Sequence, residues 1–128
     1  MLKVVAALVK KDNKYLIARR IYGDPESVGK WEFPGGKIEE NETEEHAVER
    51  ELKEEFDIVV KAKRYITNSI YSYTARTIDL RLYECDYVSG DFKLHDHSEY
   101  KFITKEELNN YDYCPADKAL VEYLIKEK

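Results

Sequence analysis

Two apolar runs separated by a polar turn open the chain and predict a β-hairpin. Leu2–Val9 is apolar at nearly every position, which is typical of a strand buried on both faces. Lys11–Lys14 has the polar composition of a turn, and Tyr15–Arg20 returns to a strand-like pattern. A mixed loop then leads to Trp31–Phe33, a short strand that the turn residues Pro34-Gly35-Gly36 are expected to stop.

A helix is predicted between Thr43 and Asp57. Apolar residues recur there at three- and four-residue steps, which is the helical period: Ala47, Val48, Leu52 and Phe56. Thr43 suits the N-cap, and acidic residues in the first turn match the positive end of the helix dipole. Asp57 then falls at the C′ position, where such a helix is expected to end.

Strands dominate the pattern that follows this helix. Val59–Tyr73 and Thr77–Tyr87 are rich in β-branched and aromatic residues, and the short link between them predicts a long hairpin. Tyr100–Ile103 reads as a last short strand, and residues 104–108 as a capped helical turn. Pro115 suits the first position of a terminal helix. The order of elements predicts a mixed α/β fold.

Composition narrows the class of protein. Apolar residues make up 43% of the chain and charged residues 37%, with five Gly and three Pro, which excludes collagen-like and low-complexity classes. A length of 128 residues predicts a single domain, residues 1–128. Val4–Val9, the longest apolar run near the start, is far shorter than the roughly 20 residues of a membrane helix. We therefore expect a soluble cytoplasmic protein in which Cys85 and Cys114 are reduced thiols.

The acidity of the chain is concentrated in residues 36–58. This acidic segment holds ten acidic and three basic residues, a local charge of −7, whereas the whole chain carries −5. Within it Glu51, Glu54 and Glu55 stand at i, i+3 and i+4 and therefore share one face of the predicted helix. The residues alone allow two interpretations: a solvated helix face, or a set of hard oxygen ligands for Mg²⁺ or Mn²⁺.

The spacing of the acidic segment resembles the Nudix box. Gly36 is followed after five residues by Glu42, and seven residues later by the run Arg50–Ile58, in which every fixed position of the box fits except the last. Asp57 stands where the family has Gly, in a left-handed helix terminus that Asp tolerates. The resemblance implies a Nudix α/β/α sandwich with a central mixed sheet.

Three further runs resemble the MutT-type subfamily, the nucleoside triphosphate pyrophosphohydrolases: Trp31–Lys37, Asp96–Tyr100 and Pro115–Asp117. They imply hydrolysis of a (deoxy)nucleoside triphosphate to the monophosphate and pyrophosphate. Two alternatives stay open: a Nudix hydrolase of ADP-ribose or a dinucleoside polyphosphate, and a nucleotide sensor without catalysis. The expected partner is a nucleotide, without a nucleic acid polymer or a membrane, and the chain is expected to be a monomer or a homodimer.

The resemblance also implies roles for residues near the phosphates. Divalent-metal ligands would be the Gly35 carbonyl, Glu51, Glu54, Glu55 and Asp96, with Glu99 as the alternative to Asp96. The cofactor would be Mg²⁺, with Mn²⁺ as a substitute. Glu51, together with Glu54 and Arg50, would form the catalytic set, with Glu51 acting as a metal ligand or as the general base on water. Arg50 would pair with Glu42 and hold the loop against the helix.

A last group of residues is expected to bind the substrate. Arg19 and Arg20 end a strand near the expected phosphates or sugar, although ordinary surface arginines are an equal alternative. Phe33 is expected either to stack on a base or to lie in the core, and Arg76 to approach the base from the long hairpin. Asp117 offers a carboxylate that accepts hydrogen bonds, which favours the amino group or ring N–H of cytosine- or guanine-type bases.

Overall fold

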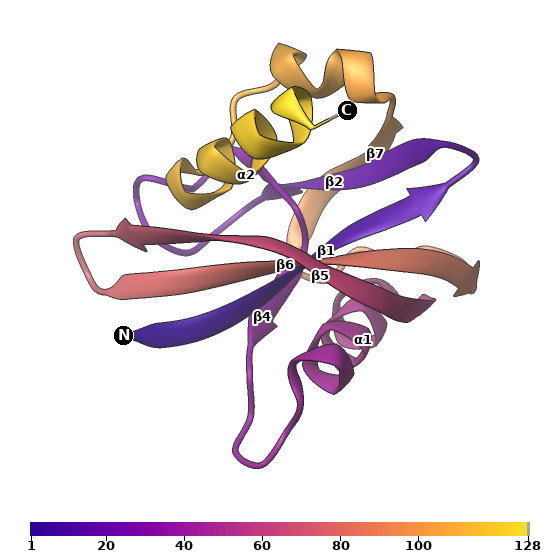
Figure 1. The fold of residues 1–128 in the computed structure, drawn as a ribbon, viewed down its shortest axis with the longest axis horizontal. Helices are drawn as coiled ribbons and strands as arrows, with labels where there is room; N and C mark the ends of the chain where they lie inside the picture. The colour runs from indigo at the N-terminus through magenta and orange to yellow at the C-terminus, as the bar shows by residue number, and fades with distance from the viewer. Residues whose placement is uncertain (128) are drawn as a thin grey trace.

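Seven strands, two α-helices and one 3₁₀-helix make up residues 1–127, the part of the chain that the computed structural model describes (Figure 1). In chain order the elements are β1 (Leu2–Lys11), β2 (Lys14–Arg20), β3 (Trp31–Glu32), β4 (Gly35–Lys37), α1 (Glu44–Phe56), β5 (Val59–Ser72), β6 (Thr77–Ser89), β7 (His97–Ile103), η1 (Lys105–Asn110) and α2 (Pro115–Lys126). The strands form one mixed sheet, which confirms the predicted α/β class.

Strand β1 lies at the centre of the sheet. It pairs in parallel with β6 from Leu2 to Lys10, and antiparallel with β4 and, at its end, with β2. The main path of the sheet runs β3-β2-β1-β6-β5, with β7 paired to β2. The β1–β2 hairpin and the long β5–β6 hairpin are both present as predicted.

Helices cover the two faces of this sheet, with α1 on one side and α2 with η1 on the other (Figure 1). Because side chains alternate along a strand, β1 serves both layers. Val5, Ala7 and Val9 pack with the core under α1, while Ala6 and Leu8 pack with the core under α2. The prediction that the first strand is buried on both faces is therefore confirmed, and the α/β/α arrangement follows from it.

The ends of α1 lie where the sequence predicts them. The Thr43 hydroxyl accepts a hydrogen bond from the backbone N–H of His46 at 3.1 Å, as an N-cap does. Asp57 adopts the left-handed conformation, with φ 59° and ψ 28°, and its N–H donates to the carbonyl of Lys53. Capping fixes the direction of the helix, and with it the direction of the face that carries Glu51, Glu54 and Glu55.

Two local predictions differ from the structure. Pro34-Gly35-Gly36, predicted to be a turn that stops β3, does follow the end of β3, but its two glycines begin a further strand, because the backbone of Gly35–Lys37 pairs with Val4–Ala6 of β1. The last strand begins at His97 rather than at Tyr100, since His97 and residues 99–103 pair with β2 and the register shifts at Ser98. Both differences arise from pairing with strands that are distant in sequence.

Two other expectations concern the chain as a whole. Cys85 and Cys114 are both buried and form no disulfide, as expected for reduced thiols. Among residues 1–127, none of the helices has the length and apolar character needed to cross a membrane.

Candidate active site

A cavity of about 240 Å³ opens where β1, β4, β6, the loop after β2 and the start of α2 meet. One wall is apolar and carries Val4, Ile78 and Leu80. The remaining wall is mostly polar, and its acidic side chains outnumber its lysine and arginine side chains. Its walls reach from the acidic segment at one end to Asp117 at the other. We call these the phosphate end and the base end, after the substrate parts that the resemblance leads us to expect there.

Arg50 gathers the acidic side chains of α1 at the phosphate end. Its Nη1 donates to Oε2 of Glu51 and to Oε2 of Glu54, both at 3.1 Å. Its Nε and Nη2 bind the two oxygens of Glu42 at 2.7 and 2.9 Å. The guanidinium therefore holds two carboxylates of the helix face together and ties that face to the loop before it. Glu54 remains 58% exposed, so its carboxylate is open to solvent and to a ligand.

Glu55 projects from the same helix into the cavity and is 8% exposed. Its Oε1 has no hydrogen-bond partner among residues 1–127. Burial raises the pKa of Glu55 to about 9, with further increases from the charges of Glu32, Glu51 and Asp96. Burial likewise raises the pKa of Glu51. The phosphate end of the cavity thus has a strong excess of negative charge.

Glycine allows the short strand β4 to lie against both β1 and α1. A Cβ on Gly36 would lie 2.4 Å from Cδ of Glu51, so Gly leaves room for that carboxylate in its present position. A Cβ on Gly35 would lie 1.9 Å from the carbonyl oxygen of Val5. Both glycines lie on the cavity wall. The Gly-Gly pair therefore places backbone and carboxylate oxygens close together at the phosphate end.

Asp96 and Glu99, the two alternatives for the later acidic ligand, lie in different places. Asp96 lies on the cavity wall and accepts a hydrogen bond from the hydroxyl of Tyr22. Glu99 lies on β7 outside that wall, where it pairs with Arg19 at 3.2 Å. Asp96 is therefore the one brought toward Glu55, which its charge influences.

At the base end, Asp117 and Glu32 are buried side by side, with Cys114 beside them; each of the three places a potential ligand atom within 4.8 Å of the other two. The backbone N–H of Phe33 donates to Asp117 at 3.0 Å. Burial raises the pKa of Asp117 well above its usual range, and the nearby Glu32 charge adds to the effect. Arg20 lies beside this pair and donates to Glu32 at 2.9 Å.

Of the other residues expected to bind the substrate, Phe33 and Arg76 lie on the cavity wall and Arg19 does not. Phe33 is 2% exposed and stacks on the ring of Tyr113, so its ring is part of the core as well as of the cavity wall. Arg76 lies on the wall, 3.7 Å from Asp24. Arg19 lies outside the wall, where Nε binds the carbonyl of Gly29 at 2.8 Å. The structure thus gathers all the expected site residues except Arg19 and Glu99 around one cavity or the adjoining face of α1.

Two buried residues that pair with each other in this cavity, Glu32 and His97, received no role from the sequence. Glu32 accepts hydrogen bonds from both Arg20 and Nε2 of His97, the latter at 2.8 Å. His97 is buried, stacks on Phe56, and has an Nδ1 without a partner among the described residues. Both belong to runs that resemble the MutT-type pattern. Their pairing spans 65 residues, and a single sequence contains no signal for it.

The phosphate end fits a divalent cation. Hard cations such as Mg²⁺ and Mn²⁺ bind carboxylate and carbonyl oxygens. The Oε1 atom of buried Glu55 is a potential metal ligand that has no hydrogen-bond partner among residues 1–127. Asp96 and the Gly35–Gly36 backbone lie on the same cavity wall, and Glu51 lies beside Gly36. The base end fits a cation less well, because Arg20 and His97 already bind Glu32.

Comparison with known proteins agrees with this arrangement. A family model described as NUDIX domain matches residues 1–124. A CTP pyrophosphohydrolase of Escherichia coli is 34% identical over 122 residues, covering 95% of this chain and 90% of that protein. An 8-oxo-dGTP diphosphatase of the same organism is 28% identical over 123 residues, covering 96% and 95%. The solution structure of the E. coli ORF135 protein superposes with a TM-score of 0.84 at 32% identity, covering 98% and 89% of the two chains.

Proposed function

Because this chain belongs to the Nudix family of hydrolases, we propose that it is a divalent-metal-dependent pyrophosphohydrolase of (deoxy)nucleoside triphosphates. Its products would be the nucleoside monophosphate and pyrophosphate. The triphosphate would lie at the phosphate end of the cavity and the base near Asp117. The two ends line one cavity, which accounts for a substrate that joins an anionic chain to a hydrogen-bonding base.

One observation carries the metal dependence. Glu55 is a buried carboxyl whose Oε1 has no partner among residues 1–127. Burial raises its pKa, and the charges of Glu32, Glu51 and Asp96 raise it further. A triphosphate adds further negative charge at this place. Without cations the two would repel each other, so we propose that substrate and metal bind together. Glu51, Glu54, Glu55, Asp96 and the Gly35 carbonyl are the proposed ligands.

The bound cation would neutralise phosphate charge and lower the pKa of water. The protein groups have separate duties. Arg50 donates hydrogen bonds to Glu51 and Glu54 and so orients these two proposed ligands without binding the metal itself. Glu51 lies beside Gly36, which is part of the cavity wall. Glu51 is the proposed general base, or else a ligand of the metal. Both assignments predict that its neutral amide variant is inactive.

The base end supports a cytosine- or guanine-type substrate. Glu32 and Asp117 offer carboxyl oxygens to an amino group or ring N–H of a base. The N–H of Phe33 and the guanidinium of Arg20 keep these two carboxyls in place. Arg76 is proposed to contact the base or sugar from the hairpin side. The relatives named for CTP and for 8-oxo-dGTP fit this range, and we propose CTP, dCTP and their oxidised forms as the first compounds to test.

The test is turnover of a panel containing canonical and oxidised (d)NTPs, ADP-ribose and a dinucleoside polyphosphate, with Mg²⁺, with Mn²⁺ and with chelator. Glu54→Gln removes a proposed ligand. Glu45→Gln is the matched control, because Glu45 is exposed on the same helix and forms no ion pair within residues 1–127. We expect metal-dependent release of pyrophosphate from a (d)NTP, lost in Glu54→Gln and retained in Glu45→Gln.

Other outcomes would change the proposal in specific ways. Cleavage confined to ADP-ribose or dinucleotides would overturn the triphosphate substrate and keep the metal chemistry. Nucleotide binding without turnover under any metal condition would make the chain a sensor and overturn the enzymatic proposal. Equal turnover by Glu54→Gln and the unmodified chain would remove Glu54 from the ligand set.

A further inference from the structure

We propose that the outer edge of β5 pairs with β5 of a second copy of this chain, forming an antiparallel homodimer centred on Ile70. Strand β5 runs from Val59 to Ser72 along one side of the sheet (Figure 1). Among residues 1–127 its only paired neighbour is β6. An unpaired strand edge presents a row of free N–H and C=O groups, which is a template for another strand.

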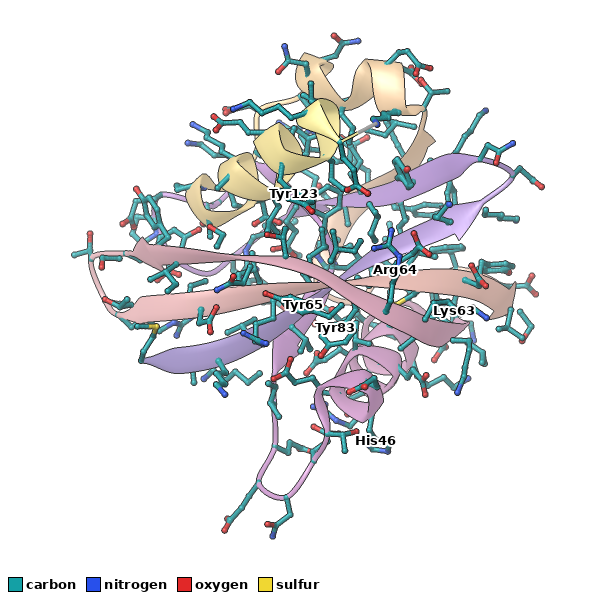
Figure 2. All side chains as sticks on the ribbon, in the orientation of Figure 1. His46, Lys63, Arg64, Tyr65, Tyr83 and Tyr123 are labelled. Atoms are coloured by element: carbon teal, nitrogen blue, oxygen red, sulfur yellow. The ribbon has the colours of Figure 1, made fainter. Side chains whose placement is uncertain are left out.

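The first half of β5 is protected against such pairing. Its register against β6 shifts at three places, between Val59 and Val60, Ala62 and Arg64, and Tyr65 and Thr67. Bulges of this kind twist an edge away from incoming strands. Lys61, Lys63 and Arg64 add positive charge, and Figure 2 shows Lys63 and Arg64 on this part of the strand.

The second half of β5 has none of these features. Its register against β6 is regular from Thr67 to Ser72. The run Tyr65–Ala75 contains no charged residue and no proline. Ile70 is 59% exposed, which is unusual for an isoleucine on a sheet. By contrast, β7 has only seven residues and carries Glu99 and Lys101. The uncharged half of β5 is therefore the open edge best suited to pairing.

The hairpin turn shows which backbone groups are free on this edge. The N–H of Tyr73 donates to the carbonyl of Arg76 and the N–H of Arg76 to that of Tyr73, so these two residues form a hydrogen-bonded pair. Such pairs alternate along an antiparallel ladder. Thr67, Ser69 and Tyr71 therefore direct their backbone groups toward β6. The residues between them direct theirs outward: Asn68, Ile70 and Ser72.

These three outward residues fix one register. With Ile70 of one copy opposite Ile70 of the other, Asn68 of each copy lies opposite Ser72 of the other. All three positions then form hydrogen-bonded pairs. Because residues 67–72 include no charged side chain, no like charges face each other across the pairing. The two exposed Ile70 side chains also lie next to each other on one face and cover each other. The second copy thus pairs with the free backbone N–H and C=O groups of β5, and each copy uses the same residues, as a two-fold dimer requires.

Cross-linking tests this register directly. Residues in a hydrogen-bonded antiparallel pair have Cα atoms about 5.5 Å apart, which is within disulfide range. We expect Ile70→Cys to form a disulfide-linked dimer under mild oxidation, which is possible because the native Cys85 and Cys114 are buried. Asn68→Cys alone should not link, since four strand residues, about 13 Å, separate the two cysteines. A mixture of Asn68→Cys and Ser72→Cys should link.

The association itself is measured by sedimentation velocity from micromolar to near-millimolar concentration. A short strand pairing is a small interface, so we expect twice the monomer mass at high concentration and dissociation on dilution. Ile70→Lys places two like charges at the two-fold axis and should give a monomer with unchanged circular dichroism. Ile125→Lys, at an exposed isoleucine of α2, is the matched control and should leave the dimer intact.

Three results would overturn the proposal: a monomer at every concentration, a dimer that Ile70→Lys leaves unchanged, or cross-linking by Asn68→Cys as efficient as by Ile70→Cys. Ile70 lies outside the cavity wall, so the turnover assay of the proposed function is independent of all three. Ile70→Thr, which keeps a β-branched residue on the strand, replaces Ile70→Lys if the latter does not fold.

Discussion

Arg50 binds both oxygens of Glu42, with Nε 2.7 Å from Oε2 and Nη2 2.9 Å from Oε1. The two residues lie eight positions apart and join the loop before α1 to the first half of the helix. The same guanidinium also binds Glu51 and Glu54. Glu42 is thus the anchor that fixes Arg50, and through Arg50 the positions of two proposed metal ligands.

This anchor predicts a pH-dependent stability difference. Hydrogen bonds from Arg50 lower the pKa of Glu42 from its ordinary value near 4.5 to about 2. A lowered folded-state pKa means that the carboxylate stabilises the fold above the unfolded pKa, and that this contribution is lost as the pH falls toward the folded pKa. We expect Glu42→Gln to lower the melting temperature at pH 7, and the difference from the unmodified chain to shrink between pH 4.5 and 2.

Thermal unfolding followed by circular dichroism over this pH range measures the effect. Glu40→Gln is the control, because Glu40 is exposed two residues earlier in the same loop and forms no ion pair with any residue of the described part of the chain. It should leave the melting temperature unchanged at every pH. A pH-independent difference for Glu42→Gln would contradict the ion-pair explanation.

The two glycines of β4 predict two different kinds of damage. In Gly36→Ala the new Cβ meets the flexible end of Glu51, which is able to move away. We expect a small loss of stability and a loss of turnover of about 10²-fold, since misplacing a reacting group by about 1 Å has this effect. In Gly35→Ala the Cβ meets the backbone carbonyl of Val5, so β4 must separate from β1.

Gly35→Ala should therefore lose several kcal/mol of unfolding free energy, beyond the range of an ordinary substitution, or fail to fold. Urea denaturation and kcat measured on both variants separate the two effects. Equal losses of stability in the two variants would show that Glu51 does not yield to the added methyl group, and that the contrast drawn from the geometry is wrong.

The left-handed conformation of Asp57 at the end of α1 predicts how stable its Ala and Gly variants are relative to the unmodified protein. A left-handed conformation costs most non-glycine residues about 1–2 kcal/mol, and Asp less than Ala. Asp57→Ala should thus destabilise the fold by about 1 kcal/mol. Asp57→Gly relieves the strain but increases the entropy of the unfolded chain by a comparable free energy, so we expect it within about 0.5 kcal/mol of the unmodified protein. Urea denaturation measures both, and Ala as the most stable variant would contradict this account.

Asp57 also illustrates what a single sequence is able to predict. Caps, turns and helix faces depend on neighbours in the chain, and for this reason Thr43, Asp57 and the glutamate face of α1 were placed correctly. The strand β4 was missed because its pairing partner, β1, lies 30 residues away. The turn composition of Pro34-Gly35-Gly36 contains no information about that partner.

The same distinction applies to the site. Arg19 and Arg20 are neighbours on β2, and alternation along a strand sends them to opposite sides. The packing of the sheet decides which arginine points toward the cavity. In the structure it is Arg20. Glu32 and His97 were not assigned roles because their contact arises only in the folded sheet. Local spacing predicted the acidic helix face, whereas the composition of the base end required the fold.

The base end provides the last prediction. Asp117 is 4% exposed and lies beside Glu32, so its ionised form is disfavoured and its pKa is raised. For an acid with a raised folded-state pKa, folding becomes less favourable as the pH rises above the unfolded pKa of about 3.9. Asn has nearly the same shape, keeps an oxygen for the N–H of Phe33 and does not ionise. The advantage in melting temperature of Asp117→Asn over the unmodified chain should therefore grow from pH 5 to pH 8.

The same substitution tests the proposed contact with the base. An amide offers an N–H donor where a carboxylate only accepts, so the pattern of hydrogen bonds presented to the base changes. One such contact is worth about 1–3 kcal/mol of discrimination between bases, which corresponds to a factor of about 5 or more in kcat/KM. We expect Asp117→Asn to change the ratio of kcat/KM between CTP and GTP by at least this factor, while pyrophosphate remains the product. A more stable variant with an unchanged ratio would leave Asp117 as a buried structural carboxyl and place base selection on Glu32 or Arg76.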